Sequence, residues 1–97
     1  MHKIAYNDCY GIFSLSKKAI DWLNDKYPDF DDFLFENRHD HRLIECIETL
    51  GSAVNGVVSN IKIKEIEGRV YRIEEYDGLE KVIEPNDEDW IIINKTK

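Results

Sequence analysis

Apolar and polar residues alternate near the start of the chain and recur at helical spacing soon afterwards. Residues 3–7 (KIAYN) alternate as a short β-strand does. The next apolar residues form one stripe of a helix that begins at Ser14 or Ser16, where a hydroxyl can accept a free helix N–H. Pro28 ends this helix, because the residue before a proline is pushed out of helical geometry. The stripe consists of Leu15, Ala19, Ile20, Leu23 and Tyr27.

A second helix is predicted from Asp40 to Leu50. Asp40 is the expected N-cap, and Gly51 can adopt the left-handed conformation that ends a helix. The apolar stripe of this helix consists of Leu43, Ile44, Ile47 and Leu50. Between the two helices, Phe30, Phe33 and Phe35 lie among acidic residues. We expect an irregular segment fixed by these rings, or an apolar surface that another chain covers.

The rest of the chain has the pattern of β-strands. Ile61 and Ile63 alternate with lysines, and residues 70–76 and 79–84 flank Asp77-Gly78, a strong hairpin signal. A two-residue turn would place Glu75 opposite Glu80, and like charges in direct contact are unfavourable. We therefore predict a three-residue loop, residues 76–78, with Gly78 left-handed and Glu75 opposite Leu79. A last apolar strand is expected at residues 90–93 (WIII).

The order strand, helix, helix and then four strands predicts an α+β fold. We expect two layers, with an antiparallel β-sheet of about five strands and two helices on one face. At 97 residues, the chain is too short for two independent cores, so residues 1–97 are interpreted as a single domain.

Composition and charge exclude several classes of partner. Thirteen basic and twenty acidic residues give a net charge of −7, which argues against duplex nucleic acid. No apolar run is long enough to span a membrane, and the N-terminus lacks the apolar stretch of a signal peptide. Cys9 and Cys46 are too few for a disulfide framework, so we expect reduced thiols and a cytoplasmic location. Residues 59–73 carry four basic residues against two acids and indicate either a basic patch or a solvated strand face.

Two groups of residues suggest ligand binding. Arg38, His39, His41 and Arg42 place four groups that can be cationic near a helix N-terminus, where an anion such as a carboxylate or phosphate is favoured. The alternative is that the two arginines pair with neighbouring acids. Tyr10, beside Gly11, can stack on a flat ligand, or it belongs to a tight turn that packs Tyr10 and Phe13 into the core.

Catalytic and metal sites have little support. A nucleophile formed by Cys9 with a histidine is conceivable, but no spacing requires it. His39, His41 and Cys46 do not complete a recognised zinc spacing, and the aspartates near residue 30 lack the glycine and glutamate of a calcium loop. We therefore predict no catalytic residues, no metal and no cofactor.

Three segments carry a resemblance to a known family. They are "YNDCYG-FSLS" near the N-terminus, "NR-D-H-LIE-IE-LG-AVNG" in the middle and "I-IKEIEGRVYRIEEYDGLEKV" late in the chain. Together they resemble a widespread family of small, uncharacterised proteins of tailed phages, prophages and some giant viruses. The family has two consecutive glycines where this chain has Gly11-Ile12. The resemblance carries over no catalytic residue; what it implies is a viral accessory protein that acts on the host.

The functional prediction combines these features. We expect a non-enzymatic, homo-oligomeric binder in the host cytosol that counters host defence by holding a small anionic ligand, such as a cyclic or ADP-ribose-type nucleotide. Tyr10, Arg38, His41 and Arg42 are the predicted ligand-binding residues. The alternative is a protein–protein inhibitor that presents its acidic surface to a basic host protein, as a nucleic-acid mimic would. An enzyme ranks third, because no nucleophile–base pair or metal set is recognisable.

Overall fold

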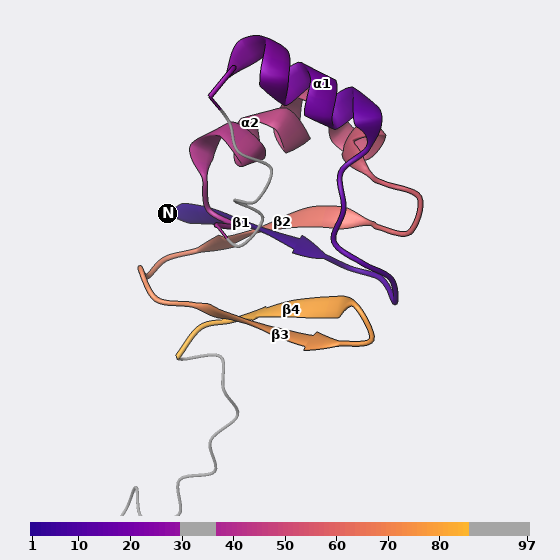
Figure 1. The fold of residues 1–97 in the computed structure, drawn as a ribbon. Helices are drawn as coiled ribbons and strands as arrows, with labels where there is room; N and C mark the ends of the chain where they lie inside the picture. The colour runs from indigo at the N-terminus through magenta and orange to yellow at the C-terminus, as the bar shows by residue number, and fades with distance from the viewer. Residues whose placement is uncertain (30–36, 86–97) are drawn as a thin grey trace, which may run out of the picture.

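The computed structural model describes residues 1–29 and 37–85 and has an α+β fold (Figure 1). The elements follow the predicted order of strand, helix, helix and strands. They are β1 His2–Asn7, α1 Lys17–Lys26, α2 His41–Leu50, the 3₁₀ helix η2 Gly51–Val54, β2 Ile61–Ile66, β3 Arg72–Tyr76 and β4 Leu79–Ile83. None of the helices in these two ranges is long and apolar enough to cross a membrane. The expected strand at residues 90–93 and the phenylalanines 30, 33 and 35 lie outside the described residues.

The predicted cap of α2 is confirmed, and of the two serines predicted for the start of α1 the cap is Ser16. Ser16 has extended backbone, and its hydroxyl accepts a hydrogen bond of 3.1 Å from the Ala19 amide. Asp40 does the same for α2, with its carboxylate 2.8 Å from the Arg42 amide. Gly51 follows α2 with φ +60°, the positive value expected there. These local signals fix where each helix begins because a side-chain oxygen satisfies an N–H that has no partner inside the helix.

The described strands pair in two separate antiparallel sheets of two strands each. β1 pairs with β2, with His2 opposite Ile66 and Asn7 opposite Ile61. β3 pairs with β4 as a hairpin. Among residues 1–29 and 37–85 the strands therefore number four and form two pairs, where the sequence predicts one sheet of about five strands.

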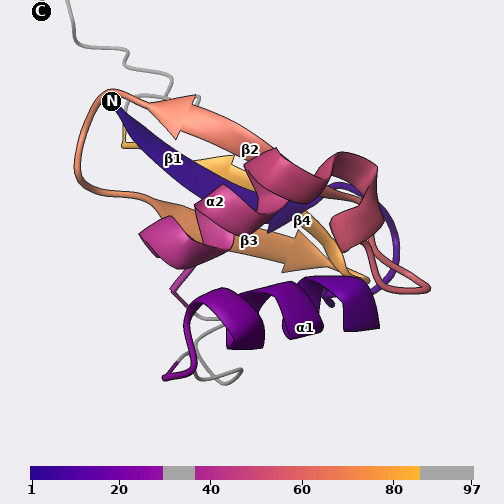
Figure 2. The same ribbon diagram turned by 90° about the horizontal axis from the view of Figure 1, so that it is seen from above.

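The elements stack in three layers rather than the predicted two. In Figure 1 the two helices lie above β1 and β2, and the β3–β4 hairpin lies below them. Figure 2 shows α1 and α2 next to each other on the helical side. The β1–β2 pair is covered on both faces because its alternate residues point opposite ways: Ala5 packs toward the helices and Ile4 toward the hairpin.

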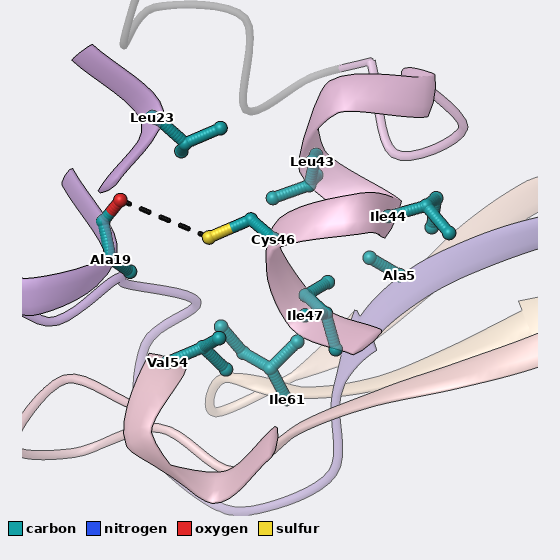
Figure 3. Close-up of a cluster of buried hydrophobic side chains, with 9 residues drawn as sticks. All are labelled: Ala5, Ala19, Leu23, Leu43, Ile44, Cys46, Ile47, Val54 and Ile61. Carbon is teal, nitrogen blue, oxygen red and sulfur yellow. Dashed lines mark hydrogen bonds between the residues drawn. The ribbon is translucent and has the colours of Figure 1, made fainter. Parts of the chain in front are cut away.

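Two hydrophobic cores follow from this arrangement. The first lies between the helices and β1–β2 (Figure 3) and consists of Ala5, Ala19, Leu23, Leu43, Ile44, Cys46, Ile47, Val54 and Ile61. The second lies between β1–β2 and the hairpin, where Ile4, Ile66 and Val82 are buried and Tyr6, Tyr71 and Ile73 pack against them. The second core places the first residues of β1, the end of β2 and the start of the hairpin side by side.

The predicted hairpin register is wrong. Tyr76 lies opposite Leu79 and Glu75 opposite Glu80, so the turn has two residues, Asp77 and Gly78, both with positive φ. This is the usual requirement of a type I′ turn. The expected repulsion between the two glutamates is avoided because each carboxylate has other partners. That of Glu75 accepts the Gly78 amide at 2.6 Å, and that of Glu80 is buried against an arginine.

Candidate functional site

Arg38 is held in a buried ion pair. Its guanidinium donates two hydrogen bonds to the Glu80 carboxylate, one of them 2.9 Å long, and its side chain is 13% exposed against 8% for Glu80. The same guanidinium lies 3.7 Å from the centre of the Phe13 ring. Glu80 also accepts the Asn7 amide at 2.8 Å. Arg38 therefore joins the segment before α2 to the hairpin and to the end of β1. It is paired with an acid, but with one that is distant in sequence and not with a neighbouring one as the alternative expected.

Arg42 and His41 have different neighbours. The Arg42 side chain pairs with Asp40, at 3.0 Å from Nε and 2.6 Å from Nη2. These hydrogen bonds lower the pKa of Asp40 to about 2. The imidazole of His41 meets the ring of Tyr27 edge-on at 6.1 Å. Arg42 and His41, in the first turn of α2, thus contact Asp40 and Tyr27.

Tyr10 lies in the loop after β1, and its side chain is 71% exposed. Phe13 in the same loop is partly buried and packs against the first core, so only one of the two rings expected in the core contacts it. The loop is tight because a Cβ at Gly11 would overlap the carbonyl oxygen of Val58. The Cys9 thiol lies near the side-chain oxygen of Asn7 and the carbonyl of Val58, and neither of these acceptors is a general base.

A pocket of about 310 Å³ opens at the end of the β1–β2 pair where β1 begins and β2 ends. We call it the His39 pocket; its lining residues are His2, Ile4, His39, Ile66, Arg69 and Tyr71. The four predicted ligand-binding residues are not among them. His2 and Ile66 are brought together by strand pairing, since they lie opposite each other in the register of β1 and β2. Arg69 and Tyr71 lie in the connection from β2 to β3. His39 lies directly before Asp40, the N-cap of α2.

The floor of the His39 pocket is apolar and its rim is polar. Ile4 and Ile66 are each 1% exposed and belong to the second core. His2, His39 and Arg69 are exposed at the rim. Among the described residues that line this pocket, none is a carboxylate. The lining therefore favours an anion, and its apolar floor favours a ligand that also has an uncharged part.

His39 and Tyr71 are joined across the pocket. The His39 Nδ1 lies 2.8 Å from the Tyr71 hydroxyl, and the two rings meet edge-on with centroids 5.7 Å apart. Burial raises the pKa of Tyr71 above its usual value, so its hydroxyl keeps its proton at neutral pH. Tyr71 is thus available as a hydrogen-bond donor as well as an acceptor.

A second cavity of about 310 Å³ serves as a comparison. It lies at the opposite end of the same strands and is lined by Tyr6, Asp8, Lys64, Leu79, Glu80, Lys81 and Val82. Its lysines share the lining with two carboxylates, and Lys62 beside it pairs with Asp8 at 2.8 Å. The mixture of charges makes it a weaker anion site than the His39 pocket. In residues 1–29 and 37–85, no cluster of three or more metal-ligating side chains is present.

Sequence reasoning found only part of the His39 pocket. His39 belongs to the cationic run considered before α2, and Arg69 to the basic stretch of residues 59–73, but the two signals lie 30 residues apart and nothing local connects them. His2 and Tyr71 carry no signal of their own. They become neighbours only because β1 pairs with β2 and the hairpin packs beneath both.

Comparisons with known proteins found no relative of this chain. No protein-family model matches the chain, and searches of curated proteins and of solved structures found no match. The resemblance to small viral proteins therefore stays a prediction.

Proposed function

We propose that this protein is a non-enzymatic binder that holds a small anionic ligand in the His39 pocket. The observation that carries the proposal is the composition of the lining: Arg69, two imidazoles and the Tyr71 hydroxyl surround an apolar floor, and the described lining residues include no carboxylate. A guanidinium can form two parallel hydrogen bonds with a phosphate or carboxylate, and these charge-assisted bonds are the strongest of their kind. The apolar floor and the aromatic edges suit a planar group attached to that anion.

A nucleotide is the ligand class that combines both features. The volume of about 310 Å³ is near the lower end of the range for small-molecule sites, so one subunit suits a mononucleotide or one half of a larger molecule. In the viral setting that the sequence suggests, binding of this kind sequesters a nucleotide immune signal in the host cytosol. The pocket replaces Tyr10, Arg38, His41 and Arg42 as the centre of the proposal, because Arg38 and Arg42 face carboxylates.

Calorimetry tests the proposal directly. The protein is titrated with adenosine monophosphate, ADP-ribose and a cyclic dinucleotide, and then the titration is repeated with Arg69→Ala. Loss of the guanidinium is expected to weaken binding by roughly tenfold or more, the effect of losing one charge-assisted contact. Arg72→Ala is the matched control: Arg72 is exposed, pairs with Glu74 and lies outside the His39 pocket. Absence of binding to every nucleotide, or equal losses in the two variants, would contradict the proposal.

A homo-oligomer is the second part of the proposal. Five exposed apolar residues support it: Tyr10, Ile12, Val57, Val58 and Tyr76. The loops that carry them meet, since the Ile12 amide donates to the Val58 carbonyl at 3.1 Å and Gly78 lies against Gly11. This surface lies at the Asn7 end of β1, whereas the pocket lies at the His2 end, so assembly and binding can be tested separately. Sedimentation of the wild type and of Val57→Glu tests it; a wild type that stays monomeric at high concentration would contradict it.

The alternative function is an acidic protein–protein inhibitor. The net charge of −7 supports it. It ranks second because acids on the helices pair with lysines: Asp21 with Lys17, and Glu48 with Lys3. These pairs interrupt the negative surface that a basic partner would need. A host protein that co-purifies in a stoichiometric complex, and dissociates as the salt concentration rises, would favour the inhibitor over the nucleotide binder.

A further inference from the structure

The hydrogen bond between His39 and Tyr71 depends on the protonation state of the imidazole. When Nδ1 carries no proton, it accepts the Tyr71 O–H across the observed 2.8 Å. When the imidazole is protonated, Nδ1 must donate, and the Tyr71 oxygen becomes the acceptor. The phenolic hydrogen is then free to turn toward another acceptor. Protonation of His39 therefore adds one positive charge and also releases one O–H donor.

The described groups around His39 supply no negative charge that could balance a protonated imidazole. His2 of β1 and Arg69 of the β2–β3 connection share the pocket; the imidazole is neutral or cationic and the guanidinium is cationic. Arg38, whose charge acts on Tyr71, already forms an ion pair with Glu80. Because the described lining holds no carboxylate, the charge that protonation adds has no counterion there. A bound anion supplies that counterion, and binding and protonation thus favour each other.

The number of donors indicates which anion fits best. Arg69, His2, His39 and the released Tyr71 hydroxyl offer four donor groups around one pocket. A phosphodiester has two free oxygens and a single charge, whereas a terminal phosphoryl group has three acceptor oxygens and a charge of about −1.5 to −2 at pH 7. A phosphomonoester therefore uses more of the donors than a diester does.

We propose that the His39 pocket recognises a terminal phosphomonoester and takes up a proton when it binds one. This inference rests on the proposed function and names both the ligand class and its regulation. A histidine loses its proton as the pH rises through neutrality, and a phosphomonoester loses its second proton near pH 6. The protonated imidazole and the dianionic phosphate therefore coexist best in a mildly acidic interval. Affinity is therefore greatest in that interval and decreases on both sides of it.

A matched pair of probes tests the ligand class. Adenosine 5′-monophosphate and adenosine 3′,5′-cyclic monophosphate share the base and ribose and differ in whether the phosphate is a monoester or a diester. At pH 6.2 the monoester is expected to bind roughly tenfold more tightly, the effect of one additional charge-assisted contact. Equal or tighter binding of the cyclic diester would overturn the assignment.

The pH dependence tests the proton uptake. Calorimetry at pH 7.5, in buffers that differ in ionisation enthalpy, should show uptake of protons with the monoester. Its affinity should fall roughly tenfold between pH 6.2 and pH 8. His39→Gln should reduce both the fall and the uptake, while Tyr71→Phe should weaken binding mainly at the lower pH. Arg69→Ala should weaken binding at every pH without changing how steeply the affinity depends on pH. Thermal unfolding of each variant at both pH values shows whether it is folded.

The possible failures are distinguishable. If no probe binds at any pH, the proposed function itself is contradicted. If adenosine 5′-monophosphate binds and Arg69→Ala weakens it, but affinity and buffer dependence do not change with pH, only the proton-linked mechanism fails. If His39→Gln retains the full pH dependence, the proton resides elsewhere and this inference is overturned.

Discussion

Arg38 and Glu80 form an ion pair across 42 residues of sequence, with both side chains largely buried. The pair fixes the hairpin beneath β1, because the same carboxylate accepts the Asn7 amide and the Asn7 side chain donates to the Gly78 carbonyl at 2.9 Å. The negative charge of Glu80 is unfavourable opposite Glu75 when the hairpin is considered alone, but it completes a polar network beneath β1. One consequence is that the hairpin should depend on Glu80 far more than on its other acids.

Replacement of Glu80 by alanine should strongly destabilise the protein. It would leave the Arg38 guanidinium buried without its carboxylate, and removal of one partner from a buried pair costs about 3–5 kcal/mol. Glu74→Ala is the matched control, since Glu74 lies in the same hairpin and forms an exposed pair with Arg72. An exposed pair contributes about 0–1 kcal/mol. Urea unfolding measures both variants; equal losses would contradict a structural role for the Arg38–Glu80 pair.

The fold could be predicted where its causes are local. The caps at Ser16, one of the two serines considered, and at Asp40 depend on residues within a few positions, and both are confirmed. The hairpin turn is at the predicted Asp77-Gly78 pair, but it has two residues and not the predicted three. The hairpin register depends on Arg38, which is distant in sequence, and so a rule about neighbouring like charges gave the wrong answer. The packing of the hairpin on the far face of β1–β2 is non-local for the same reason.

The candidate site was less predictable than the fold. A run of cationic residues before α2 suggested an anion site, but that pattern cannot show which side chains meet acids. Arg38 meets Glu80 and Arg42 meets Asp40, whereas His39 between them faces a pocket. The other rim residues come from β1 and from the β2–β3 connection, so the site exists only after the strands have paired.

Asp40 should stabilise the protein in a pH-dependent manner. Its hydrogen bonds with Arg42 lower its pKa from 3.8 to about 2 in the folded state. A lowered folded-state pKa stabilises the protein above pH 3.8, and this contribution is lost as the pH falls toward 2. Asp40→Asn keeps an oxygen for the helix cap but removes the charge. It should cost roughly 2 kcal/mol at pH 7 and about half of that at pH 3.

Unfolding free energies at pH 7, 4 and 3 test this expectation. Asp21→Asn is the control, because Asp21 forms an exposed pair with Lys17 and should change stability by less than about 0.5 kcal/mol. A difference between wild type and Asp40→Asn that stays constant from pH 7 to pH 3 would show that the charge of Asp40 is not the cause.

The two cysteines should differ in reactivity. Cys46 is fully buried, near the Ala19 carbonyl (Figure 3), and burial raises the pKa of its thiol to about 11. Cys9 is partly exposed in the loop after β1. Because the thiolate is the reactive form, a thiol reagent at pH 8 should modify Cys9 in the folded protein and Cys46 only after denaturation. Cys9→Ser should abolish the reaction of the folded protein, whereas rapid modification of that variant would show that Cys46 becomes exposed.

Gly78 and Gly68 offer a test of how closely the hairpin turn approaches the loop after β1. Gly78 has φ +87°, and a Cβ there would overlap the backbone of Gly11. Gly68 has nothing within 4 Å of the same position and no positive φ. Gly78→Ala should therefore destabilise the protein by about 2 kcal/mol or more, through both strain and overlap. Gly68→Ala should be neutral or stabilise it by up to about 1 kcal/mol, because alanine restricts the unfolded chain. Thermal unfolding compares the two variants.

A mild effect of Gly78→Ala would mean that the turn moves away from Gly11 at little cost. The network of Asn7, Glu80 and Arg38 would then hold the hairpin less rigidly than the contacts indicate.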